Sequence, residues 1–298
     1  MRRQNDILWK SVLEEVFDDL LRFVYPGADQ VFDMKRGFEF LDKELAEMYP
    51  EPEKEGDTRF VDKLVKVFRA DGQEEWLLVH IEVQGETDDR PAFAERMFRY
   101  FYRIFDRFRK PVTAIAIYTG PDGKRMPGRF TYEFLNTRLV YQFNTLCMVD
   151  YEDEDLATNL NPFALVMLAA KKALDRGKDV DAKLLEGKLF VFRKLYERGI
   201  FGKPKMEAVL RFLNNYVRFE KSETNRIFTE EIDKITGKTN TMSIIEQVTE
   251  LRVEEARREG DEKAVRLLLQ NTEFSVEKIA DLVGVAVAFV KEVKEGQQ

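Results

Sequence analysis

The chain has 298 residues, enough for one large domain or two modest ones, and its 48 Lys and Arg against 55 Asp and Glu give a formal charge of −7. Its 44% hydrophobic and 35% charged residues are typical of a globular protein. The acidity excludes a surface that is cationic throughout. No apolar run reaches the roughly 18 residues of a membrane span, and the first residues lack the apolar core of a signal peptide. We therefore expect a cytoplasmic protein that does not contact membranes.

The single cysteine, Cys147, and the single histidine, His80, narrow the chemistry further. One cysteine cannot form an intramolecular disulfide, and these two residues together cannot build a Cys/His zinc site. A Ser-His-Asp arrangement could form only around His80. Any metal is therefore expected to be a hard cation held by carboxylates.

Hydrophobic periodicity predicts an α/β arrangement for the first half of the chain. The predicted elements are a helix over 6–24, a short strand within 37–45, a loop over 49–57, strands over 59–68 and 74–85 joined by an Asp-Gly turn, a helix over 92–109, and strands over 112–120 and 137–151. In the helix over 92–109, we expect Phe101, Ile104, Phe105 and Phe108 to face the core.

The second half is expected to be helical. The predicted elements are helices over 162–175, 182–198 and 204–219, a polar linker over 220–242, a long charged helix over 243–270 and two short helices within 275–294 that Gly284 separates. We expect an α/β domain at 1–160, a helical extension at 161–220, and a linker with a C-terminal helical module at 221–298.

The two C-terminal helices can be interpreted as a helix-turn-helix. They carry few groups that read bases or phosphates, which favours a packing or oligomerisation module and would allow a homo-oligomer.

The hairpin contains the candidate site. Asp62 lies among apolar residues on the first strand, and Glu82 lies on the return strand with His80 and Gln84 on the same face. In a simple register Asp62 and Glu82 face each other. Two carboxylates this close repel unless a cation lies between them, although acidic residues at the open end of a hairpin can equally be ordinary surface charges.

Four segments in order, FVDKLVKVF, HIEVQGE, FAERMFRYFYRI and VTAIAIYTG, carry a family resemblance. Together they resemble the recombination-promoting nucleases and related transposases (YhgA-like), within the PD-(D/E)XK nuclease superfamily, over roughly residues 5–175. The resemblance implies a restriction-endonuclease-like core of helix, three strands, helix and strand. It also implies a Mg²⁺- or Mn²⁺-dependent endonuclease that hydrolyses phosphodiester bonds in DNA during recombination or transposition.

The resemblance assigns roles to individual residues. Asp62 and Glu82 correspond to the two acids, and with the Val83 carbonyl they would hold the metal. Gln84 stands where most of the superfamily has lysine, although this family shows the E-x-Q form. A neutral amide can orient a water by hydrogen bonds but cannot lower its pKa as a cation would.

The helix after the hairpin carries a stripe of arginines at positions 96, 99, 103 and 107. Residues 90–129 contain ten Lys or Arg and three Asp or Glu, a net +7, so the rest of the chain carries −14. Arg96 and Tyr100 resemble a polar residue and tyrosine that several superfamily nucleases use, and we expect DNA contacts from Arg96, Arg99, Tyr100 and Arg103. The alternative is an ordinary solvated face.

Three further residues are candidates for a supporting role near the site. His80 can fix the orientation of Glu82, or it can be a hydrogen-bonded core histidine. Asp6 and Glu14 on the opening helix are candidates for a further acid near the site, and Asp6 can instead pair with Lys10.

Two classes of function remain open. The first is the metal-dependent endonuclease. The second is a catalytically weak or silent nuclease-fold module that binds DNA or protein, which Gln84 and the overall acidity favour. A glycosidase with paired carboxylates is a third hypothesis, but no residue is identified as the protonated acid that it needs.

Overall fold

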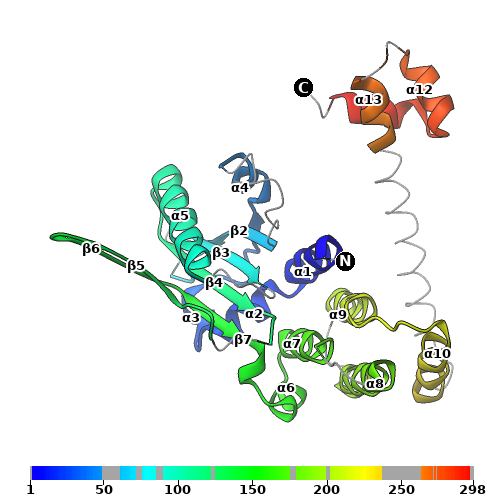
Figure 1. Ribbon diagram of the computed structural model, residues 1–298, viewed down its shortest axis with the longest axis horizontal. Coiled ribbons are helices and arrows are strands. Elements are labelled where there is room, and N and C mark those ends of the chain that lie inside the picture. Colours follow the sequence, from blue (N-terminus) through cyan, green and yellow to red (C-terminus); the bar gives the residue numbers. More distant parts are fainter. Residues whose placement is uncertain are drawn as a thin grey trace. The chain divides into compact units, whose positions relative to one another are not determined.

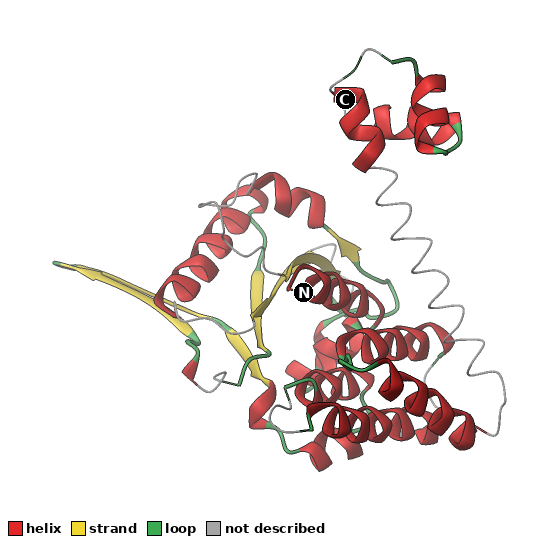
Figure 2. Cartoon of the chain, turned by 45° about the vertical axis from the view of Figure 1, so that its right-hand side comes forward, coloured by secondary structure: helices red, strands yellow, loops and turns green. Residues whose placement is uncertain are grey.

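The computed structural model describes residues 2–48, 61–71, 76–84, 90–121, 125–174, 179–198, 202–236, 263–270, 272 and 274–295. It divides the chain into two compact units, residues 1–235 and 236–298, which are described separately (Figure 1). The first unit combines sheets with helices, which confirms the mixed α/β class (Figure 2). None of the described helices is long and apolar enough to cross a membrane. The predicted loop over 49–57 lies outside the described residues.

The predicted helix over 6–24 is observed as two helices. These are α1 (Arg2–Glu15) and α2 (Phe17–Val24), which meet at Val16. Their apolar stripe is buried throughout, at Leu8, Trp9, Val12, Leu13, Val16, Phe17, Leu20 and Leu21. Gly27 then turns the chain with a φ of 81°, which glycine adopts at little steric cost, and the short α3 (Ala28–Val31) follows.

The main sheet has five strands in the order β1, β2, β3, β4, β7. The strands are β1 (Glu39–Phe40), β2 (Val61–Phe68), β3 (Trp76–Gln84), β4 (Val112–Tyr118) and β7 (Asn144–Cys147). The first three pair antiparallel, and β3, β4 and β7 pair parallel. The hairpin strands and β4 therefore confirm the prediction, whereas the strand expected within 37–45 is only two residues long and leads into α4 (Asp42–Met48).

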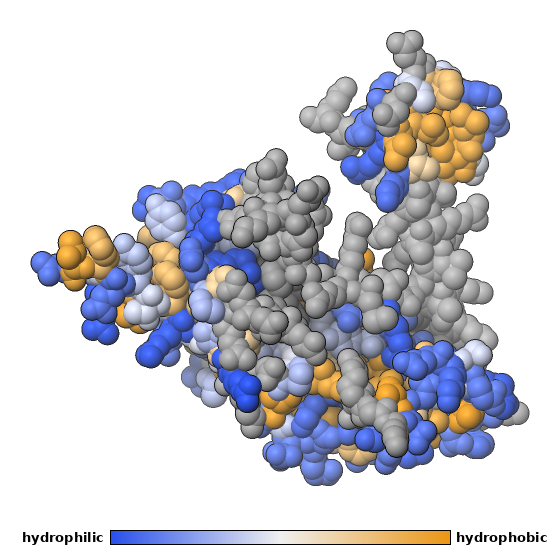
Figure 3. All heavy atoms as spheres, viewed as in Figure 1, coloured by the Kyte–Doolittle hydropathy of each residue, from blue (hydrophilic) through white to orange (hydrophobic). Residues whose placement is uncertain are grey.

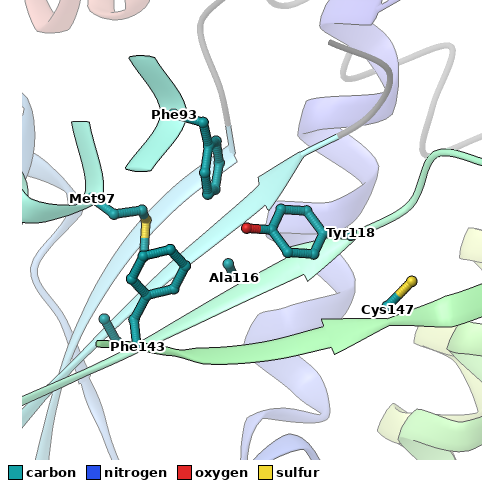
Figure 4. Packing of buried hydrophobic residues seen from close by; sticks show 7 residues of the cluster. Phe93, Met97, Ala116, Tyr118, Phe143 and Cys147 are labelled. Atoms are coloured by element: carbon teal, nitrogen blue, oxygen red, sulfur yellow. The ribbon is translucent and has the colours of Figure 1, made fainter. Parts of the chain in front are cut away.

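α5 (Arg90–Phe108) is the crossover between the parallel strands β3 and β4. Its buried side chains recur at helical spacing: Phe93, Ala94, Met97, Tyr100 and Ile104. Figure 4 shows Phe93 and Met97 packed with Ala116 and Tyr118 of β4 and with Phe143. The expected core face was therefore wrong in part, since Ile104 is buried but Phe105 is 41% exposed. The helix has two apolar stripes, and the sheet takes the one that begins at Phe93.

A second, two-stranded sheet interrupts the path from β4 to β7. Its strands are β5 (Arg129–Phe134) and β6 (Thr137–Gln142), which form an antiparallel hairpin that projects from the unit (Figure 1). The single strand predicted over 137–151 was wrong, because this stretch contains β6, β7 and the 3-10 turn Met148–Asp150, and the two strands belong to different sheets. We refer to residues 129–142 as the arm.

A helical layer follows the sheet. Its members are α6 (Asp153–Thr158), α7 (Pro162–Lys172), α8 (Val180–Arg198) and α9 (Lys203–Tyr216), so the three predicted helices are confirmed. α7 is buried from Pro162 to Ala170, since it contacts α2, α6, α8 and α9. Asn161 begins it: its side chain accepts a hydrogen bond from the Phe163 amide at 2.8 Å and donates one to the Asp19 carbonyl at 2.8 Å.

The linker predicted over 220–242 was wrong for its described part, which forms α10 (Ser222–Thr236). The carboxylate of Asp181 on α8 accepts hydrogen bonds from the amides of Glu220 (2.8 Å) and Lys221 (2.9 Å) and from the hydroxyl of Thr224 (2.9 Å). These donors, the Glu220 amide first, hold the pKa of Asp181 below its usual value. Phe228 and Ile232 are buried on one face of the helix together with Thr224 and Thr236, and the charged residues that suggested a linker lie on the other faces.

A lysine without a carboxylate partner in its described surroundings is buried between α8, α9 and α10. Lys188 is 1% exposed, and its ammonium donates to the carbonyls of Asn214 and Val217, both at 3.1 Å. The rings of Phe219 and Phe228 lie 4.8 and 4.4 Å from its Nζ. Burial lowers the pKa of Lys188 to about 7.

The second unit contains helical residues 263–270, α12 (Val276–Val283) and α13 (Val287–Glu295), so the two short C-terminal helices are confirmed. Ser275 caps α12, and Gly284 ends it with a φ of 76°. The core of this unit is Val265, Ile279, Ala280, Val290 and Val293. Most of the long helix predicted over 243–270 lies outside the described residues.

Candidate functional site

The hairpin register places the two candidate acids side by side. Asp62 on β2 and Glu82 on β3 are direct cross-strand partners in the antiparallel ladder, as the simple register predicts. Directly opposed residues in such a ladder have Cβ atoms roughly 4.5–5.5 Å apart and share one face of the sheet. The ladder therefore brings positions 62 and 82 within reach of a single small ligand.

The register also identifies the face. Asp62 is two residues from Leu64, which packs with Tyr100 and Ile104 of α5. Glu82 is the partner of Ala116 on β4, which packs in the cluster with Phe93 and Met97. Because residues two apart in a strand share a face, positions 62 and 82 fall on the face that α5 covers.

The neighbouring candidates have fixed positions in the same ladder. His80 is the partner of Leu64 and of Ala114, and Gln84 is the partner of Tyr118, so both positions share the face of Glu82. The side chains of Asp62, His80, Glu82, Val83 and Gln84 lie outside the described residues, as does that of Asp6, so their roles remain predictions.

The beginning of α5 lies at the same end of the sheet as the acids. The ring of Phe93 in its first turns is 5.4 Å from the ring of Tyr118, the register partner of Gln84. Arg96 follows within one helical turn, and its guanidinium carbon lies 5.1 Å from the centre of the Phe93 ring. Arg96 is therefore the arginine of the stripe that the packing places closest to the level of the paired acids.

The far half of the arginine stripe binds α4 instead. Arg103 donates to the carbonyl of Met48 at 3.0 Å, and Arg107 donates to the carboxylate of Glu47 at 3.1 Å. Tyr100 is buried among Leu45, Leu64 and Ile104. Of the four residues expected to contact DNA, Arg96 and Arg99 are partly exposed, Tyr100 packs in the core, and Arg103 already holds α4.

Lys63 is absent from the predicted site residues, yet it follows Asp62 in the chain and its side chain is fully buried. It falls on the face of the sheet opposite Asp62, with Val65 and Val67. Its ammonium lies 2.5 Å from Glu14 of α1 and 2.7 Å from Asp42 of α4. A lysine on the apolar face of a strand that otherwise alternates Val residues is the sequence signal that identifies it.

This ion cluster decides two points about the site. Glu14, expected to support the acids, pairs with Lys63 on the other side of the sheet. Lys63 cannot take the place of the superfamily lysine, for which this chain has Gln84. Its ammonium is bound by Glu14 and Asp42 on the face of the sheet opposite the acids. Its structural effect is to tie α1, α4 and β2 together next to Asp62.

Replacing Lys63 by methionine is expected to lower the free energy of unfolding by about 2 kcal/mol. Losing one member of a buried ion cluster costs roughly 3–5 kcal/mol, and the cost is smaller here because Glu14 and Asp42 still reach solvent. Urea unfolding of the variant and the wild type measures this difference in the free energy of unfolding. Lys66→Met on the same strand removes a more exposed pair with Glu39 and should cost under about 1 kcal/mol. Equal costs for the two variants would contradict the proposed anchor.

Within the described part of the chain, no group of three His, Cys, Asp or Glu side chains could hold a metal ion. The carboxylates of Asp62 and Glu82 are not among the residues covered by that statement. Burial raises the pKa of the Cys147 thiol, so this residue is not a ready nucleophile.

Comparison with known proteins gives no significant match, whether with family models, with curated proteins or with solved structures.

Proposed function

We propose that the chain is a metal-dependent DNA endonuclease, linked to recombination or transposition, in which Asp62 and Glu82 hold Mg²⁺ or Mn²⁺. The observation that supports it best is the cross-strand pairing of these two acids. Opposed like charges in a ladder are destabilising. Their presence at one register position is the arrangement that a divalent cation favours, since oxygen ligands and negative charge suit this class of ion.

The donor set fits a hard cation. Two carboxylates and the backbone carbonyl of Val83 would hold the ion, with water completing its shell. When bound, the metal supplies an activated water and neutralises charge that develops on the phosphate oxygens.

The protein groups around the pair have separate tasks. Gln84 would orient the attacking water through its amide, because it offers hydrogen bonds but no charge. Two arginines of α5 are suited to bind phosphate groups of the DNA backbone: Arg96, at the level of the pair, and Arg99, about one helical turn further along. Tyr100 is buried with Leu64 of β2, which supports a role in holding α5 against β2.

A silent nuclease-fold module is the second candidate. It is favoured by one specific observation: neither Gln84 nor Lys63 provides a cation beside the acids, so activation of water would depend on the metal alone. Such a module would bind DNA in a salt-sensitive way without needing Asp62 or Glu82.

Metal binding separates the two candidates. We expect calorimetric titration of the wild type with Mn²⁺ to show saturable binding that Glu82→Gln abolishes, and plasmid cleavage that requires Mg²⁺ or Mn²⁺. Glu39→Gln is the matched control, because Glu39 lies on the same sheet and pairs with Lys66 away from the acids. Equal binding by wild type and Glu82→Gln, or no binding by either, would contradict the endonuclease and favour the silent module.

A further inference from the structure

The arm has one apolar and one polar face. The register pairs Phe130 with Tyr141, Tyr132 with Leu139 and Phe134 with Thr137 on one face. The other face pairs Arg129 with Gln142, Thr131 with Val140 and Glu133 with Arg138. Cross-strand partners share a face, so the arm is an amphipathic ribbon whose only strongly apolar residue on the polar face is Val140.

Among the described residues of the unit, those of α5 stack on the apolar face and cover its base. Phe130 stacks on Phe98 of α5, with ring centres 5.1 Å apart, and Tyr141 stacks on Phe101 at 4.8 Å. Further out the same face is bare, since Tyr132 is 49% and Phe134 is 63% exposed. Figure 3 shows hydrophobic atoms at the free end of the arm, at the left of the view.

The tip adds an apolar side chain at a place where glycine would be favoured. Leu135 begins the two-residue turn with a φ of 50° and is 85% exposed. A bulky residue rarely adopts positive φ, and an apolar side chain that stays exposed to water contributes no hydrophobic stabilisation. Leucine at this position therefore costs stability in the free chain.

α5 presents the complementary surface. Phe98, Phe101, Tyr102 and Phe105 form one stripe at helical spacing, of which the arm covers the first two. Tyr102 is 57% and Phe105 is 41% exposed, and Phe105 stacks on Phe101 at 6.0 Å. The stripe therefore continues past the arm as exposed aromatic surface, although the guanidinium carbon of Arg109 lies 5.8 Å from the centre of the Phe105 ring.

We propose that two copies of the chain associate through their arms: the base of each arm stays on its own α5, and the exposed outer part of its apolar face packs on the exposed half of the other copy's α5 stripe. In a two-fold pair each copy offers both surfaces, so both are covered at once. The exposed side chains of Tyr102, Phe105, Tyr132, Phe134 and Leu135 offer roughly 600 Å² per copy. Burial in both copies reaches the roughly 1,200 Å² at which specific interfaces begin.

Charge favours a second copy over nucleic acid. The three charged residues of the arm, Arg129, Glu133 and Arg138, all fall on the polar face, and the latter two oppose each other. The apolar face holds no charge that could meet a phosphate. A two-stranded ribbon is also marginally stable alone, and packing against a partner would stabilise it. This proposal is independent of the endonuclease.

Sedimentation of the full-length chain tests this association. We expect the wild type to form dimers at micromolar concentration, and Phe134→Glu to raise the dimer dissociation constant at least 10-fold. Thr131→Glu, an exposed neighbour on the polar face, is the matched control and should leave it unchanged. Leu135→Gly suits the turn, so it should weaken the dimer without destabilising the chain.

A second measurement identifies the surface that the arm meets. Phe105→Lys should also be monomeric, and an equimolar mixture of Phe105→Lys with Phe134→Glu should regain dimers, since one half of the interface is native and the other pairs opposite charges. A wild-type monomer, a dimer that Phe134→Glu leaves intact, or no recovery on mixing would overturn the proposal. Loss of DNA binding in Phe134→Glu, with a monomeric wild type, would assign the arm to nucleic acid instead.

Discussion

Replacing Glu82 by glutamine is expected to reduce Mg²⁺-dependent plasmid cleavage by roughly 10²–10³-fold. Glutamine keeps the size of the side chain and its place in the ladder, but it removes one of the two charges that would hold the metal. Charge stabilisation by a bound cation is worth several kcal/mol in such a transition state, and each 1.4 kcal/mol changes the rate tenfold. Asp62→Asn should have a similar effect.

The double variant gives the sharper test. Two residues that act through one ion should not lose activity additively, so Asp62→Asn with Glu82→Gln should be no worse than either change alone. Glu39→Gln, on the same sheet but paired with Lys66, should cleave at the wild-type rate. Activity that is unchanged in all of these variants would place cleavage at another site or in a contaminant.

Raising the pH from 7 to 9 is expected to stabilise the wild type by about 2.5 kcal/mol relative to Lys188→Met. The pKa of Lys188 is about 7 in the folded chain, against 10.5 for an ordinary lysine. Between these values the unfolded chain holds a proton that the folded chain does not, so stability rises with pH by about 1.4 kcal/mol per unit. Below pH 7 both states are protonated, and the burial cost is constant.

Urea unfolding of the two proteins at pH 6, 7, 8 and 9 measures the difference. Lys203→Met serves as control, because Lys203 lies on α9 with 77% of its side chain exposed. Its curve should stay parallel to that of the wild type. If the free energies of unfolding of the wild type and Lys188→Met changed with pH in parallel, the prediction would be contradicted. The carbonyls of Asn214 and Val217 and the two aromatic rings would then keep the pKa of Lys188 near that of an ordinary lysine.

Local patterns predicted the elements that form the candidate site. The alternating strands around the Asp-Gly turn predicted the hairpin. The pairing of Asp62 with Glu82 also depended on the register, because a two-residue turn at Asp71 and Gly72 would place Asp62 opposite Ile81 instead. β4 was predicted because a continuous apolar run suits a strand that is covered on both faces, as this one is. The assignment of catalytic roles came from the family resemblance and stays a prediction.

Contacts between distant residues decide what the patterns could not. α5 has two apolar stripes, and only the position of the sheet and of the arm determines which one enters the core. α10 resembles a linker because its composition is polar, and its start is fixed by Asp181, some 40 residues earlier in the chain. The buried pairing of Lys63 needs carboxylates from two other helices, which no local window contains.

The first helices of the chain are covered by some of the last residues of the first unit. Trp9 is 1% exposed and lies against Phe212, with ring centres 5.0 Å apart. Asp18 and Asp19 bind Lys205 at 2.8 and 2.6 Å. During synthesis, Phe17 can meet Phe38 and Phe40 early, whereas Trp9 and the pair Asp18 and Asp19 must wait for about 200 further residues before they reach these partners. The boundary near residue 160 consequently separates two kinds of secondary structure but not two folding units, and a fragment that ends there would expose the core it needs to stay soluble.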